Sequence, residues 1–241
     1  NYKFSRFNLK AAAVFQNQYR SSGPLGSKML EYSRDAVLPE MFAGIDYRKE
    51  GFIVGVGADV LTLTPRTQST KGELTYKVSE RNVSASLLAF ASYSSEWWKL
   101  NAKTIYGQNN VHTLSLGGYG VTSIDPVTGA YDYVNFNHST SWVNVVYGKK
   151  WQVGLFGGFT KNLGTNKPLV SSSMTYGMGM DIDKLYNMSV QTDYNIKNFT
   201  IGVEYSYSVA DYGTIQTATG KVTNTHAADN HRIAALCNYS F

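Results

Sequence analysis

The feature that most constrains this chain is an alternation of apolar and polar residues that recurs along its length. In the segment 199–209, for example, Phe199, Ile201 and Val203 are separated by small or polar residues. Successive side chains of a β-strand point to opposite faces of a sheet, so such a segment has one apolar face and one polar face. Ten segments follow this pattern, which predicts an all-β fold of ten long strands. The segments are 4–19, 40–48, 52–60, 83–94, 98–106, 138–147, 151–161, 185–194, 199–209 and 228–241.

The connections between these segments are alternately short and long. The short ones lie near 48–51, 95–96, 148–150 and 195–198, and the long ones near 20–38, 64–80, 109–134, 164–182 and 214–228. Tilted strands of about 9–11 residues cross a bilayer, and membrane barrels have short turns at one end and long loops at the other. A soluble β-sandwich has shorter strands and less regular loops. The pattern therefore predicts a single-domain, antiparallel transmembrane β-barrel over residues 1–241.

The aromatic residues support a membrane position. Most of those at strand ends flank the short turns, as an aromatic girdle at headgroup depth would. They are Tyr47, Phe52, Tyr93, Trp97, Trp98, Tyr147, Trp151, Tyr194, Phe199, Tyr239 and Phe241. The mean hydropathy of −0.26 does not argue against this, because only alternate residues of a barrel strand face lipid.

The last segment resembles the closing strand of bacterial outer-membrane β-barrels, because it alternates and ends on an aromatic residue, Phe241. The stretches 211–213, 220–224 and 229–232, leading to 239–241, are similar to the ends of DcaP-like porins. This resemblance implies a homotrimer of about sixteen-stranded barrels that takes up small, often anionic, solutes such as dicarboxylates. We therefore predict a location in the bacterial cell outer membrane, in contact with outer-membrane lipid and lipopolysaccharide.

Two interpretations of the strand number remain open. The chain forms either a closed ten-stranded barrel or the C-terminal part of a larger, about sixteen-stranded one. Its start at Asn1-Tyr2-Lys3-Phe4 resembles the turn-plus-aromatic starts at Lys150-Trp151 and Asn198-Phe199. We expect the larger barrel.

The polar faces of the strands carry the candidate functional residues. Nine charged residues are predicted to line the pore: Lys10, Asp46, Arg48, Asp59, Lys99, Lys103, Asp193, Glu204 and Arg232. Lys99 and Lys103, together with Lys10, could form a basic ladder, or the charges could instead pair with one another. The net charge of +5 inclines the expectation toward anions. The predicted function is diffusion of small polar solutes through a charged lumen.

The longest connection, 109–134, admits two roles. It could fold inward and constrict the lumen, or pack externally against its neighbours or a partner subunit. Asp125-Pro126-Val127-Thr128-Gly129 predicts a turn, and therefore a hairpin within this loop is also possible.

Other classes of function receive weaker support from the sequence. His138 and Thr140 share a strand face, as the His and Ser of outer-membrane phospholipases do, and His226 near Asp229 and Asp211 faintly resembles the Asp-His pair of the omptin proteases. An adhesin or structural barrel is a third alternative. We predict no catalytic residue, metal site or cofactor. Cys237 is the only cysteine, which excludes a cysteine metal cluster. We also predict no nucleic-acid partner, because no basic run occurs.

Overall fold

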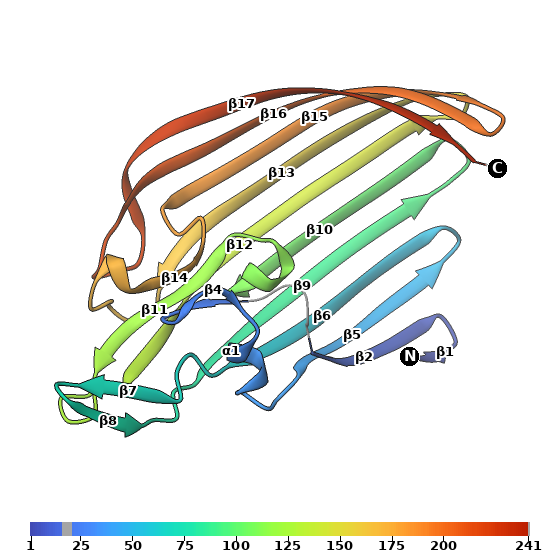
Figure 1. Ribbon diagram of the computed structural model, residues 1–241. Coiled ribbons are helices and arrows are strands. Elements are labelled where there is room, and N and C mark those ends of the chain that lie inside the picture. Colours follow the sequence, from blue (N-terminus) through green and yellow to red (C-terminus); the bar gives the residue numbers. More distant parts are fainter. Residues whose placement is uncertain (16–20, 241) are drawn as a thin grey trace.

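The computed structural model describes residues 1–15 and 21–240. Its centre is a 13-stranded antiparallel sheet in which the long strands follow one another in chain order, each hydrogen-bonded to the next. Figure 1 shows this sheet as a row of long, tilted strands that curves into a trough. The long strands are β2 (Phe7–Val14), β5 (Glu40–Lys49), β6 (Phe52–Leu63), β9 (Asn82–Ser94), β10 (Trp98–Gln108), β12 (Tyr131–Gly148), β13 (Trp151–Thr165), β15 (Ile182–Ile196), β16 (Phe199–Ile215) and β17 (Val222–Tyr239).

These ten strands coincide with the ten predicted segments, and the four predicted short turns join them in pairs. The short strand β1 (Tyr2–Phe4) pairs with β2 at one edge, and β17 lies at the other. The sheet is open, because β1 and β17 do not pair within the described residues. Residues 16–19 of the first segment and the terminal Phe241 lie outside the described residues.

Two strand regions are longer than the alternation alone predicts. β12 begins at Tyr131 instead of His138, because its first part pairs with the loop strand β11 (Gly117–Ile124). β16 and β17 together convert most of the predicted loop 214–228 into a ladder, with Thr214 opposite Thr223. β-Branched residues such as threonine favour strands, which accounts for the extension.

The outer face of the sheet is apolar and exposed. Val56 on β6, Leu155 on β13 and Met188 on β15 have exposed fractions of 54%, 56% and 58%. Such a broad exposed apolar surface is unfavourable in water and matches a lipid environment. Aromatic pairs flank the short turns, including Phe52–Tyr93 and Trp151–Tyr194, whose ring centroids are 5.2 and 4.4 Å apart. The predicted girdle is therefore present.

The long loops contain their own secondary structure. It comprises β3 (Ser21–Gly23), β4 (Gly26–Met29), α1 (Glu31–Arg34), β7 (Gln68–Lys71), β8 (Leu74–Lys77), the 3-10 helices η1 (Asn110–Thr113) and η2 (Ser172–Met174), and β14 (Thr175–Met178). Within the described residues, no helix has the length and apolar character needed to span a bilayer. β11 pairs with both β12 and β14, which joins two loops to the main sheet. The hairpin considered for the loop 109–134 is thus formed.

The buried hydrophobic clusters lie where these loops pack on the strand ends. One cluster consists of Tyr32 on α1, Leu61 and Leu63 on β6, and Tyr119 on β11. A second contains Phe136 on β12 with Leu169 and Met180 from the loop before β15. The loops are therefore a packed part of the fold, and their core is continuous with the sheet.

Candidate functional site in the polar face of the sheet

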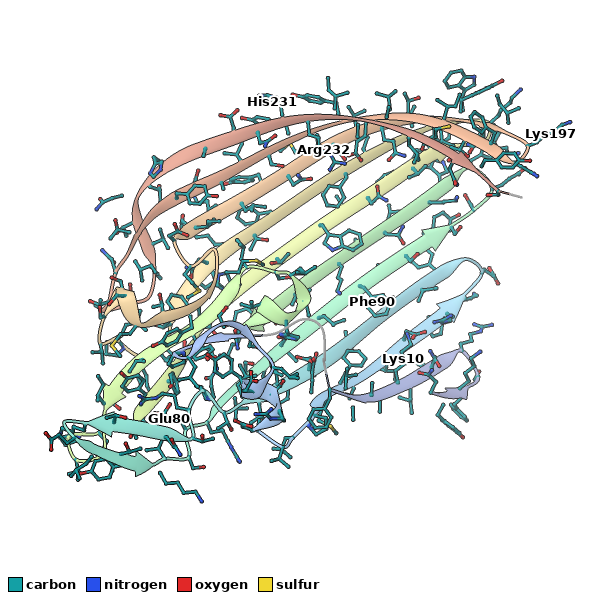
Figure 2. All side chains as sticks on the ribbon, in the orientation of Figure 1. Lys10, Glu80, Phe90, Lys197, His231 and Arg232 are labelled. Carbon is teal, nitrogen blue, oxygen red and sulfur yellow. The ribbon has the colours of Figure 1, made fainter. Side chains whose placement is uncertain are left out.

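All nine predicted pore-lining residues lie on one face of the sheet. Directly opposed residues of neighbouring strands point to the same side, and the register links Asp46 through Gly55 and Phe90 to Lys103. We call this polar face the inner face, because the long loops pack against it. Figure 2 shows Arg232 directed to this side of β17 and its neighbour His231 directed to the other.

Three of the predicted residues form one ion cluster. The carboxylate of Asp46 is almost fully buried and accepts contacts of 2.7 Å from Lys10 Nζ and 2.6 Å from Arg48 Nε. The side-chain amide of Asn8 donates to the same carboxylate at 3.0 Å. Charge-assisted bonds of this kind fix the side chains in place. Asp46 therefore offsets the charge of Lys10, which sets Lys10 apart from the predicted basic ladder with Lys99 and Lys103.

Asp59 belongs to a second cluster, with Glu40 on β5 and His112 on η1. His112 Nε2 lies 3.2 Å from Glu40 Oε1, and both side chains are largely buried. Burial lowers the pKa of the His112 imidazole, but its hydrogen bond to Glu40 and the nearby charge of Asp59 outweigh this, so that the pKa is raised overall. Neither Glu40 nor His112 was identified from the sequence as a site residue.

Lys99, Lys103 and Arg232 form no ion pair within the described part of the chain. The remaining acids do have local hydrogen-bond donors. Gln191 donates to Asp193 at 2.6 Å, and Ser206 donates to Glu204 at 2.8 Å. Among the described residues of the inner face, Lys99, Lys103 and Arg232 are therefore cations without an ion pair, while the most buried carboxylate, that of Asp46, is held between two cations.

A polar groove follows the inner face from β12 to β17. Its lining includes Glu204 and Arg232 together with uncharged hydrogen-bonding side chains. These are Asn144, Asn187, Ser189, Gln191, Ser206, Ser208 and Asn230. Side-chain donors and acceptors of this kind can replace part of the hydration shell of a polar solute.

The opposite half of the inner face carries an aromatic patch that sequence reasoning missed. Phe42, Phe90 and Trp142 line a second groove together with Lys103. The rings lie over glycines of neighbouring strands: a Cβ on Gly55 would be 2.6 Å from Phe90 Cζ, and one on Gly57 would be 2.8 Å from Phe42 Cε2. The sequence signal that could have revealed this aromatic patch was the glycines in the predicted polar faces, beside the rings.

The start of the loop 109–134 folds toward the inner face. The Ser86 hydroxyl on β9 donates to Asn110 at 2.8 Å, and His112 reaches Glu40 on β5. Farther along, the Tyr119 hydroxyl donates to the carbonyl oxygen of Ser22 at 2.8 Å. The loop was predicted either to fold inward or to pack externally, and this geometry agrees with inward packing.

The residues considered for catalysis are not assembled into a triad. Thr140 Oγ1 lies 3.1 Å from Thr160 Oγ1, and the ring nitrogens of the buried His138 form no hydrogen bond within the described residues. His226 pairs with Tyr212, whereas Asp211 pairs with Ala227, so that His226 and Asp211 point to opposite faces.

Comparison with solved structures relates this fold to known proteins. The outer membrane channel DcaP of Acinetobacter baumannii superposes with a TM-score of 0.67 and 14% sequence identity, covering 100% of this chain and 61% of that one. OmpT, an outer membrane protein of Vibrio cholerae, gives a TM-score of 0.54 and 11% identity, covering 99% of this chain and 62% of that one. The chain thus spans less than two thirds of these proteins. Neither a protein-family model nor a curated protein sequence matches it.

These similarities establish the fold and agree with the location predicted for the chain. Both proteins are outer-membrane proteins, and both superpose over essentially the whole of this chain. The chain therefore has the fold of a bacterial outer-membrane β-barrel protein and is DcaP-like in its architecture.

Proposed function

We propose that this protein is an outer-membrane channel through which small polar solutes diffuse, with a preference for anions. The observation that carries the proposal is the excess of cations on the inner face. The single carboxylate of Asp46 is shared by two cations, Lys10 and Arg48. Among the described residues, Lys99, Lys103 and Arg232 add three cations without an ion pair, against the two acids Asp193 and Glu204, which have neutral hydrogen-bond donors. A lumen with uncompensated cations lowers the electrostatic barrier for anions and raises it for cations.

The inner face has two regions suited to different parts of a solute. The polar groove between β12 and β17 offers amides and hydroxyls, and the groove near Lys103 offers aromatic rings. A small organic anion could exchange water for these groups while its charge lies near Lys103 or Arg232. The inward segment at η1 would set the width of this path.

The proposal also covers the assembly of the protein and its lack of enzyme activity. We infer that the complete barrel has about sixteen strands, as in large outer-membrane barrels, and that it forms a homotrimer. The proposed interface is the exposed apolar outer face of β2, with Phe7, Leu9, Ala11 and Ala13, together with Phe15 just after this strand. We also propose that the protein is not an enzyme and needs no cofactor for transport.

Planar-bilayer recording of the full-length refolded protein tests the function. We expect discrete conductance steps and, in a KCl gradient, a reversal potential with the sign of anion preference. A cation-selective reversal potential would refute the anion preference but leave the channel intact. Complete absence of steps from a correctly folded protein would exclude the channel and favour an adhesin or structural barrel. Native electrophoresis with chemical cross-linking tests the trimer independently.

A further inference from the structure

Glu40, Asp59 and His112 form a compact cluster where η1 meets the inner face. One ligand atom of each lies within 4.8 Å of the other two, and His112 Nε2 is 3.2 Å from Glu40 Oε1. The side chains of His112 and Glu40 are only 4% and 15% exposed. The three residues come from three different elements, η1, β5 and β6.

The cluster brings two carboxyl groups together beside an imidazole. Two carboxyl groups at this separation and in this sheltered position repel each other if both are ionised. A proton on the carboxyl groups or on His112, or a bound cation, removes the repulsion. The imidazole of His112 is the third group, and as a neutral ring it is a common metal ligand.

The donor set and its spacing suit a metal ion. Zinc in sites with open positions takes three protein ligands at about 2.0–2.2 Å, drawn from His nitrogens and Asp or Glu oxygens, with water in the fourth position. Two ligands of a tetrahedral ion at these bond lengths are about 3.4 Å apart, close to the separation of His112 Nε2 and Glu40 Oε1. Small rotations of the carboxylates would bring the remaining atoms into range.

We propose that Glu40, Asp59 and His112 bind a divalent transition-metal ion of the zinc class, which fastens η1 to the inner face of β5 and β6. Magnesium and calcium are poorer candidates, because they take six or more oxygen ligands and do not favour imidazole. The position of η1 is already supported by the hydrogen bond between Ser86 and Asn110, so that His112 is presented to the wall before an ion binds.

The chain contains a matched comparison for this cluster. His231 Nε2 lies 3.2 Å from Asp229 Oδ2, the same imidazole–carboxylate separation as in the cluster. This pair is 59% and 54% exposed. In addition, Asp229 is the only acidic side chain within ion-pair distance of His231 among the described residues. It therefore lacks both the second carboxylate and the shelter that the proposed site requires.

Isothermal titration of Zn²⁺ into the metal-stripped, full-length protein in detergent tests the site. We expect one ion per chain and at least a tenfold loss of affinity in both His112→Gln and Asp59→Asn, with His231→Gln within about twofold of the wild type. Asp59→Asn also relieves the carboxylate repulsion, so it should fold even if His112→Gln does not; folding is checked by circular dichroism.

Two results would overturn the site. One is the absence of zinc binding by the folded wild type, which would indicate that a proton on the carboxyl groups or on His112 balances the cluster. The other is binding that persists in the folded Asp59→Asn variant or is lost in His231→Gln. An effect of Zn²⁺ on conductance rests on the proposed channel function, but the titration does not. Binding without channel activity would therefore contradict only the channel.

Discussion

The ammonium group of Lys10 on β2 lies 2.7 Å from the buried carboxylate of Asp46 on β5. Arg48 holds the other oxygen of the same carboxylate at 2.6 Å. One anion of the inner face is thus shared between two cations, and a simple count of charged residues misrepresents the field that a solute would meet.

Replacing Asp46 by asparagine should destabilise the sheet. It removes the charge that both cations contact, and breaking a buried ion pair costs several kcal/mol. Because Lys10 and Arg48 are 35% and 50% exposed, solvent reduces the expected loss to about 1–3 kcal/mol of unfolding free energy. Urea unfolding in detergent measures it. Asp193→Asn is the control, and equal stability of the two variants would contradict the cluster's role.

Reversing the two unpaired lysines of β10 should abolish the anion preference. Lys99 and Lys103 share the inner face about 13 Å apart along one strand, so that Lys99→Glu with Lys103→Glu changes the local charge by four. We expect the reversal potential in a KCl gradient to shift toward cations. Lys197→Glu, at the short turn after β15, should leave it unchanged. Unaltered selectivity in the double variant would remove these lysines from the solute path.

A methyl group at Gly55 should be poorly tolerated. A Cβ there would lie 2.6 Å from Phe90 Cζ and 2.7 Å from the carbonyl oxygen of Ile45. Overpacking of this kind costs about 1–3 kcal/mol. Gly154 is also on the inner face, but its nearest neighbour, Gln191 Cβ, would be 3.6 Å away. Chemical unfolding should therefore show a loss for Gly55→Ala and little change for Gly154→Ala; the reverse order would disprove the ring-over-glycine packing.

Truncating Tyr119 should loosen the inward loops. Its ring is fully buried beside Tyr32, Leu61 and Leu63, and loss of such a ring costs about 3–5 kcal/mol. Tyr119→Phe removes only the hydrogen bond to Ser22 and should cost about 1 kcal/mol. Trypsin cleavage at Arg34 and single-channel conductance should both increase in Tyr119→Ala. Tyr106→Ala, half exposed on the outer face, is the control for the loss of a tyrosine ring.

Arg66 and Glu80 lie in the same long connection, between β6 and β9, and attach it to the turn between β11 and β12. The guanidinium Nε lies 3.0 Å from Glu80 Oε1, and one terminal nitrogen also donates to the carbonyl oxygen of Gly129 at 2.8 Å. The carboxylate is 1% exposed and additionally accepts from the backbone NH of Tyr131 at 2.7 Å. The pair therefore attaches the segment 64–80 to the β11–β12 hairpin.

Arg66→Ala should cost about 3–5 kcal/mol, because it leaves a buried carboxylate without its cation. Adding Glu80→Gln should recover part of that loss, since the uncompensated charge is then gone. A double-mutant cycle on thermal unfolding measures the coupling. Strict additivity of the two substitutions would mean that the pair does not act as a unit.

The strands could be predicted from sequence because their environment is two-sided. Val54 and Val56 face outward while Gly55 and Gly57 face inward, and lipid on one side and polar surroundings on the other impose a period of two. The inner aromatic patch was missed for the same reason: Phe42 and Phe90 occupy positions that the pattern assigns to polar groups.

The loop contacts follow no such period. Glu40, Asp59 and His112 are brought together by the fold of η1 onto the wall, and nothing in their spacing along the chain indicates this. Likewise, Lys10 was assigned correctly to the inner face, but its partner depended on the diagonal placement of Asp46 across two strands.

The inward loops also have a consequence for the order of folding. Tyr119 donates to Ser22 across 97 residues of sequence, and its cluster uses Leu61 and Leu63 from a strand of the main sheet. Contacts between such distant segments form slowly, because the intervening chain must first lose its entropy. Hairpins across the short turns should therefore form early, and the loops should dock last, on a wall that already exists.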